Sequence, residues 1–224
     1  MQTSQSIIPL RPLRYISLLA AILLAQLLII SYYVSGPDEI AQAAAQEGNL
    51  IDWSSALGYF IGVATMLIFG GYHVIRYHWP LMLSLALLGM RELDLDKKFS
   101  TYGLFKSATL KASDVSLLEK GITIVIIAAI ASLTILLIKR YWRTLISSFF
   151  HLEAVSFITC FAGGMLVLAR TLDGISRKAA DFGVVVTQHN EILTTIAEEV
   201  LELGAPYTFI LAFFAYRRIY LAAR

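Results

Sequence analysis

The sequence is short of charged and reactive residues. Only 15% of its 224 residues are Asp, Glu, Lys or Arg, whereas a soluble domain carries about 25%. The same chain is 58% hydrophobic, with a mean hydropathy of +0.70. These values exclude an ordinary soluble domain. The single cysteine, Cys160, cannot form an intramolecular disulfide, and its place in an apolar run predicts a small packing residue.

Histidines are also scarce, which weighs against zinc. A tetrahedral zinc site built from several histidines needs them close together. His73, His78 and His151 lie at the ends of apolar runs on one predicted side, and only His189 lies with the acidic residues. We therefore expect neither zinc nor haem. The sequence has no glycine-rich phosphate loop, and its polar connections are short, so we expect no nucleic-acid partner.

Long apolar runs are what the sequence does contain. Most extend over roughly 18 residues or more, enough to cross a hydrocarbon layer of ~30 Å as helix. They predict an all-α fold, a single integral membrane domain over residues 1–224 with about six transmembrane helices. The first run is longer than the 7–15 residues typical of a signal peptide, so we expect it to be retained. The predicted spans are 15–34, 51–71, 78–97, 121–138, 147–169 and 197–217.

The distribution of charge predicts the orientation. Six spans place both termini on one side, which we assign to the cytoplasm. Lys and Arg are equally numerous on the two sides, but the predicted inner connections are shorter and more densely basic, so the positive-inside rule is satisfied moderately. We expect a bacterial inner (cytoplasmic) membrane. Membrane lipids are the expected partners, together with a partner membrane protein or a second copy of the chain. The residues assigned to the inner side are Arg11, Arg14, Arg76, Lys139, Arg140, Arg143, Glu153, Arg217, Arg218 and Arg224.

The third predicted span places charge inside the membrane. The apolar run from His78 to Met90 corresponds to about 20 Å of helix, which is too short to cross ~30 Å. We therefore expect the helix to continue through Arg91 to Asp96. Arg91 and Glu92 then lie roughly two-thirds of the way across the membrane.

The sixth predicted span leads to the same depth. Counting ~30 Å back from Arg217 reaches about residue 197, so that Glu198, Glu199 and Glu202 lie within the outer part of the layer. Glu202 is about 22 Å from Arg217, a depth similar to that of Arg91. Buried charges in membranes usually pair. The expected pairs are Arg91 with Glu198 or Glu202, and Arg170, Arg177 or Lys178 with Glu92, Asp94 or Asp173.

These groups form a candidate charged pocket in the outer leaflet, and three interpretations remain open. It is an ion-pair network that holds helices in register, a hard-cation site for Mg²⁺, Ca²⁺ or Mn²⁺, or an acid/base site. The candidate metal ligands are Glu92, Asp94, Glu198 and Glu202. The pocket as a whole comprises Arg91, Glu92, Asp94, Asp173, Arg177, Glu198, Glu199 and Glu202.

The leading functional hypothesis is a non-catalytic or accessory membrane protein whose charged pocket binds a lipid headgroup, a cation or a partner helix. The alternative is a membrane-embedded, lipid-active enzyme that uses the carboxylates around a divalent cation. A weaker alternative is an ion or proton translocator, because the first, second and fourth spans offer no ionisable group at mid-depth. Whether the chain is an enzyme is therefore left open.

Small residues predict two places of close helix packing. Ser54, Gly58 and Gly62 are spaced by four and share one helix face. Stripes of this kind let helices approach closely in membranes. Gly163 and Gly164 in the fifth span are expected to serve the same purpose.

Overall fold

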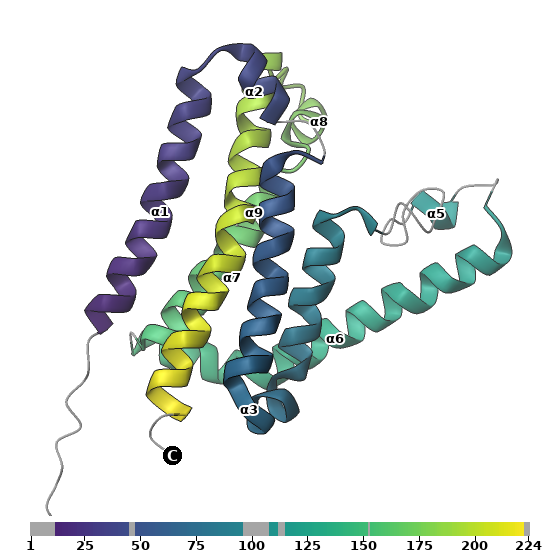
Figure 1. The fold of residues 1–224 in the computed structure, drawn as a ribbon. Coiled ribbons are helices and arrows are strands. Elements are labelled where there is room, and N and C mark those ends of the chain that lie inside the picture. The colour runs from purple at the N-terminus through teal and green to yellow at the C-terminus, as the bar shows by residue number, and fades with distance from the viewer. Residues whose placement is uncertain (1–11, 45–47, 96–107, 112–114, 152, 222–224) are drawn as a thin grey trace, which may run out of the picture.

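The computed structural model describes residues 12–44, 48–95, 108–111, 115–151 and 153–221, which are helical and contain no strand. This confirms the predicted all-α fold. Five helices (α1, α3, α6, α7 and α9) are long and apolar enough to cross a membrane, which indicates an integral membrane protein. The elements are α1 (Pro12–Ser35), α2 (Asp38–Ala44), α3 (Leu50–Glu92), α5 (Ala108–Lys111), α6 (Leu117–Phe150), α7 (Ala154–Leu172), α8 (Ile175–Ala180), α9 (Gln188–Tyr216) and the π-helical end η1 (Arg217–Leu221) (Figure 1).

The long helix α3 folds back on itself at Gly71. The backbone there has φ 66° and ψ −178°, a conformation that glycine adopts without steric cost. Figure 1 shows the two halves side by side and antiparallel. A Cβ atom on Gly89 would lie 3.1 Å from the Tyr59 Cβ, and one on Gly62 would lie 3.9 Å from Leu85. The predicted spans 51–71 and 78–97 are therefore the two halves of α3.

The second half of α3 begins earlier and ends earlier than predicted. Because the reversal takes place at Gly71, the residues before His78 are helical rather than a loop. This half needs no extension to cross ~30 Å, since about 21 residues already give about 31 Å. It ends at Glu92, and Asp94 follows in a turn with φ 48°. The predicted helical continuation through Asp94 is wrong, while Asp96 and residue 97 lie outside the described residues.

The boundary between the fourth and fifth predicted spans is also wrong. Helix α6 begins at Leu117 and continues to Phe150, so it does not end at 138. Lys and Arg are good helix formers, and the basic pair Lys139–Arg140 therefore does not interrupt it. The chain reverses at His151 and Glu153, and α7 begins at Ala154 instead of 147.

The remaining helices agree better with the sequence. Helix α1 covers the predicted span 15–34. Helix α9 ends near the predicted residue 217 but begins at Gln188 instead of 197, where the Thr187 side chain accepts a hydrogen bond from the Asn190 backbone N–H. A polar first turn with a side-chain cap extends this helix beyond its apolar stretch.

Helix α9 is the centre of the bundle and packs on α1, α3 and α7 (Figure 1). Against α3, a Cβ atom on Gly58 would lie 2.9 Å from the Pro206 Cγ, and one on Gly62 would lie 3.5 Å from Ile210. The predicted stripe of small residues is therefore confirmed as a packing surface. The same prediction is wrong for Gly163 and Gly164, where an added Cβ would meet no described atom within 4 Å.

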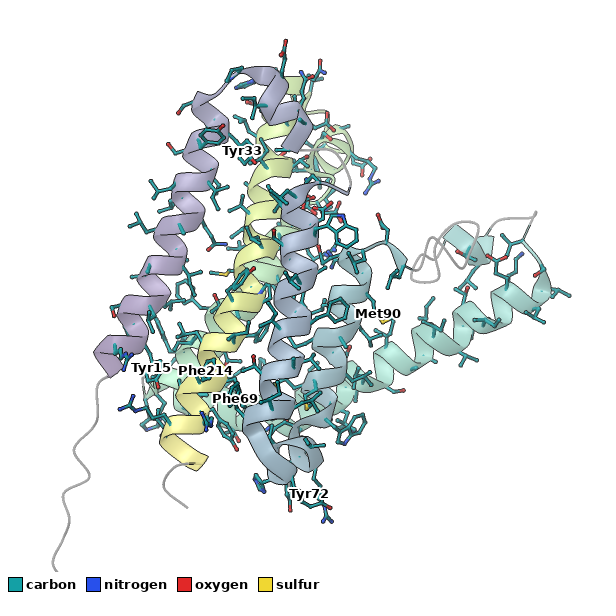
Figure 2. All side chains as sticks on the ribbon, viewed as in Figure 1. Tyr15, Tyr33, Phe69, Tyr72, Met90 and Phe214 are labelled. Atoms are coloured by element: carbon teal, nitrogen blue, oxygen red, sulfur yellow. The ribbon has the colours of Figure 1, made fainter. Side chains whose placement is uncertain are left out.

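The two ends of the bundle differ in chemistry. We call the end with the Gly71 turn and the last turn of α9 the basic end, and the opposite one the acidic end. At the basic end the His78 ring nitrogens lie 2.9 Å from the Tyr141 hydroxyl and 3.2 Å from the Tyr216 hydroxyl, which ties α3 to α6 and α9. Figure 2 shows other aromatic side chains gathered there, namely Tyr15, Phe69, Tyr72 and Phe214.

Candidate functional site

Glu202, on α9, lies at the centre of a buried ion-pair network. The residue is only 4% exposed. The Arg91 Nη2 atom, in the last turn of α3, donates hydrogen bonds to both Glu202 carboxylate oxygens, at 2.7 and 2.8 Å. The predicted pairing of Arg91 with Glu202 is therefore confirmed. It joins α3 and α9 through two residues that are 111 positions apart in the sequence.

Arg170 extends the network to a third helix. Its Nη2 atom, from the last turn of α7, lies 3.3 Å from the Glu202 Oε1, and its Nη1 atom donates to the Asp173 Oδ2 at 2.9 Å. Arg91 Nη2 also lies 3.0 Å from the Glu92 Oε1. We call these five residues (Arg91, Glu92, Arg170, Asp173 and Glu202) the Glu202 network. It contains the predicted Arg170–Asp173 pair and one more carboxylate than it has arginines.

A second group of carboxylates lies next to this network, and none of them is paired with a basic side chain in the part of the chain that the structure describes. Asp52, in the first turn of α3, is 8% exposed, and its Oδ2 accepts a hydrogen bond of 2.7 Å from the Gly48 backbone N–H. Its Oδ1 is buried and has no partner among the described residues. The Glu199 side chain lies close to Asp52, and the other charges that act on it most strongly are those of Glu202 and Glu198. All of these charges are carboxylates.

Two more buried polar atoms near the network have no hydrogen-bond partner among the described residues. One is the hydroxyl of Tyr59, a fully buried residue on which the charges of Glu92 and Glu202 act most strongly. The other is the Oε1 of Gln26, from α1, whose Nε2 donates to the Val200 carbonyl at 2.7 Å. Buried polar atoms are nearly always satisfied by protein, water or a ligand. Together with the Asp52 Oδ1, these atoms leave three buried polar groups on α1 and α3 without a hydrogen-bond partner among the described residues.

The other predicted site residues occupy the edge of this region. Glu198 interacts electrostatically with Asp173 and Glu202. Arg177 lies on α8, where its guanidinium covers Gly174, and it forms no ion pair with a carboxylate in the described ranges. Within the part of the chain that the structure describes, no group of three or more His, Cys, Asp or Glu side chains could hold a metal ion. A divalent cation at Glu92, Asp94, Glu198 and Glu202 stays a prediction.

Sequence reasoning did not include Gln26, Asp52, Tyr59 or Arg170 among the site residues. A signal existed for Gln26, since it is the only amide within the apolar run 15–34. Arg170 was expected as an ion-pair partner, but its contact with Glu202 was not. For Asp52 the signal was its position in the first turn of a predicted span, at the same end of the bundle as Glu199.

No protein family, curated protein or solved structure matches the chain. Its function is therefore inferred from the arrangement of its own residues.

Proposed function

We propose that this chain is a non-catalytic integral membrane protein whose acidic site binds a positively charged group. The acidic site consists of Asp52, Glu198 and Glu199 beside the Glu202 network. The observation that carries the proposal is the proximity of Asp52 and Glu199, two largely buried carboxyls to which no basic side chain among the described residues is paired. Adjacent carboxylates repel each other at low dielectric, so a cationic group between them removes an unfavourable interaction.

The unsatisfied atoms support a ligand that donates hydrogen bonds. The Asp52 Oδ1 and the Gln26 Oε1 are both acceptors, and both lack a donor among the described residues. An ammonium group carries three N–H donors and a positive charge. It suits this site better than a divalent metal, because no cluster of three or more metal ligands is assembled within the described residues. The positive charge that the site requires is carried by a lipid ammonium headgroup or by a small inorganic cation.

The Glu202 network supports the site in a different way. Arg91 and Arg170 are already engaged by Glu202, Glu92 and Asp173. Neither arginine is therefore free to neutralise Asp52 and Glu199. The network fixes α3, α7 and α9 relative to one another, and the acidic site is left with an excess of negative charge.

We also propose that the chain crosses a bacterial inner membrane six times and that both termini lie in the cytoplasm. Each half of α3 is about 31 Å long by helical rise, enough for one crossing, so that α3 counts twice. With that arrangement the basic end faces the cytoplasm, as the positive-inside rule favours. The acidic site then opens toward the outer leaflet, where a lipid headgroup reaches it.

The test is thermal unfolding of the purified protein in phosphatidylcholine nanodiscs. One arm adds phosphatidylethanolamine, whose ammonium group carries the N–H donors that the choline headgroup lacks, and the others add KCl or MgCl₂ to lipid of unchanged composition. A ligand that binds only the folded state stabilises it by RT ln(1 + [L]/Kd), so Tm rises with ligand concentration. We expect a rise in at least one arm for the wild type and for the control Glu39→Gln, an exposed carboxylate on α2. We expect none for Glu199→Gln. Equal shifts in all three proteins, or no shift in any, would contradict the proposal.

A further inference from the structure

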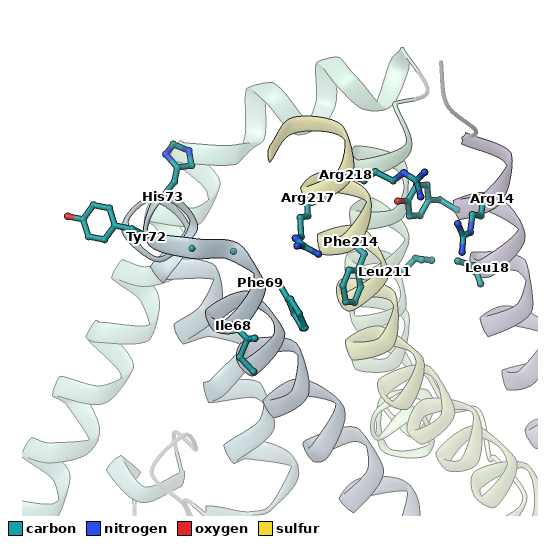
Figure 3. A pocket seen from close by; sticks show the side chains of 13 residues that line it. Arg14, Leu18, Ile68, Phe69, Tyr72, His73, Leu211, Phe214, Arg217 and Arg218 are labelled. Atoms are coloured by element: carbon teal, nitrogen blue, oxygen red, sulfur yellow. The ribbon is translucent and has the colours of Figure 1, made fainter. Parts of the chain in front are cut away.

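A second candidate binding site lies at the basic end of the bundle, far from the acidic site. A cavity of about 990 Å³ opens where α1 begins, where α3 reverses and where α9 passes into η1 (Figure 3). Ligand pockets in proteins have volumes of about 300–1,000 Å³. None of the residues that line this cavity is Asp or Glu. Its chemistry is therefore opposite to that of the acidic site.

Three arginines supply the charge of the cavity. Arg14 comes from α1, and Arg217 and Arg218 come from η1. Figure 3 shows the Arg218 and Arg14 side chains extending into the same space between α9 and α1. No carboxylate in the described ranges forms an ion pair with any of them. Like charges held close together repel, and an anion between them reverses that cost.

Apolar side chains form the wall beside these arginines. The Phe69 and Phe214 rings lie 6.1 Å apart, and the Arg217 guanidinium lies 5.3 Å from the Phe69 ring centroid. Ile68, which is 71% exposed, and Leu18, which is 44% exposed, continue the apolar surface. Both belong to helices that cross the hydrocarbon layer in the proposed topology. The cavity thus joins a cationic rim to an apolar wall.

We propose that this cavity binds an anionic phospholipid, with the headgroup phosphate on Arg14 and Arg218 and the acyl chains along Leu18 and Ile68, while Arg217 adds positive charge beside Phe69. Phosphate oxygens accept charge-assisted hydrogen bonds from guanidinium groups. A free phosphate ion would contact the arginines but not the apolar wall. An amphiphile occupies both surfaces, and an anionic membrane lipid is the amphiphile that this depth supplies.

The charge is tested by titrating purified protein in neutral detergent micelles with a fluorescent phosphatidylglycerol, and separately with the matching phosphatidylcholine. We expect phosphatidylglycerol to bind more tightly. Arg14→Gln with Arg218→Gln should weaken its binding by about tenfold or more. The matched control, Arg76→Gln with Arg143→Gln, removes two exposed arginines from the same end outside the cavity and should change it by less than about twofold. Equal affinity for the two lipids, or equal losses in the two double variants, would overturn the proposal.

The apolar wall distinguishes a lipid from a free anion. Ile68→Ser should weaken phosphatidylglycerol binding several-fold. Leu67→Ser, on the neighbouring residue that is 46% exposed but does not line the cavity, should not. Inorganic phosphate should compete only weakly with the lipid. If inorganic phosphate displaces the lipid at comparable concentration, and Ile68→Ser has no effect, then the site binds phosphate alone and the lipid assignment is wrong.

Discussion

Arg91 and Glu202 meet across the interface between α3 and α9, with the Arg91 Nη2 atom 2.7 and 2.8 Å from the two Glu202 carboxylate oxygens. The carboxylate is 5% exposed, whereas the arginine side chain is 30% exposed. Glu202 is thus enclosed by protein, and its charge depends on Arg91 and Arg170 for compensation. This contact fixes the second half of α3 against the central helix.

Neutralising Glu202 should destabilise the protein. In Glu202→Gln, Arg91 keeps only Glu92 and Arg170 keeps only Asp173, so the shared ion pair that links α3, α7 and α9 is lost. Breaking a fully buried pair costs about 3–5 kcal/mol, and partial exposure of Arg91 lowers our expectation to about 2 kcal/mol. The measurement is thermal unfolding in phosphatidylcholine nanodiscs, with Glu39→Gln as control. A Tm equal to that of the control would show that the network contributes nothing to stability.

Neutralising Glu199 should have the opposite effect when no ligand is bound. The charges acting on Glu199 are those of Asp52, Glu202 and Glu198, all negative. Glu199→Gln removes repulsion without breaking an ion pair, so we expect a gain of roughly 0.5–1 kcal/mol. The same unfolding assay, in nanodiscs without ammonium lipids or added salt, compares it with Glu202→Gln. A loss of stability in both variants would mean that Glu199 has a basic partner after all.

Gly204 should be required for the contact between α1 and α9. A Cβ atom at this position would collide with the Gln26 side chain, whose Nε2 donates to the Val200 carbonyl. Overpacking of this kind costs about 1–3 kcal/mol, so Gly204→Ala should lower Tm. Adding Gln26→Ala should restore most of the loss because it removes the obstructing amide. Gly164→Ala on α7 is the control, since its Cβ meets open space. If the two glycine variants unfold alike, α1 does not pack here as described.

The hairpin fold of α3 predicts that its Gly71 turn and the acidic end of the bundle lie on opposite sides of the membrane. Tyr72, next to the turn, is 75% exposed, and Val185, between α8 and α9, is 92% exposed. In a Cys160→Ser background, a membrane-impermeant maleimide added to intact cells should label Val185→Cys and not Tyr72→Cys. Permeabilised cells should show labelling of both. Labelling of Tyr72→Cys from outside would contradict the proposed orientation, and labelling of both from outside would contradict the crossings between them.

Counting helical rise predicted that Arg91 pairs with Glu198 or Glu202, because it placed these residues at similar depths. It did so although the second half of α3 begins at the Gly71 turn and not at His78. It could not predict the Asp52–Glu199 contact, which depends on how α3 and α9 are rotated and placed beside each other. The same limit applies to Gln26, whose contact with α9 is a matter of lateral packing. Boundaries failed where charge was used as a stop signal, as at Lys139–Arg140, because charged residues are compatible with helix.

The central claim is that Asp52 and Glu199 hold a positively charged group, and native mass spectrometry of the purified protein tests it most directly. The protein is released from nanodiscs that contain phosphatidylethanolamine, with tetraethylammonium acetate, which carries no N–H donor, as the only salt and with KCl supplied in a parallel sample. We predict that wild-type protein retains one phosphatidylethanolamine or one potassium ion that Glu199→Gln does not retain, while Glu39→Gln behaves as wild type. The same adducts in the same proportions on all three proteins would contradict the claim.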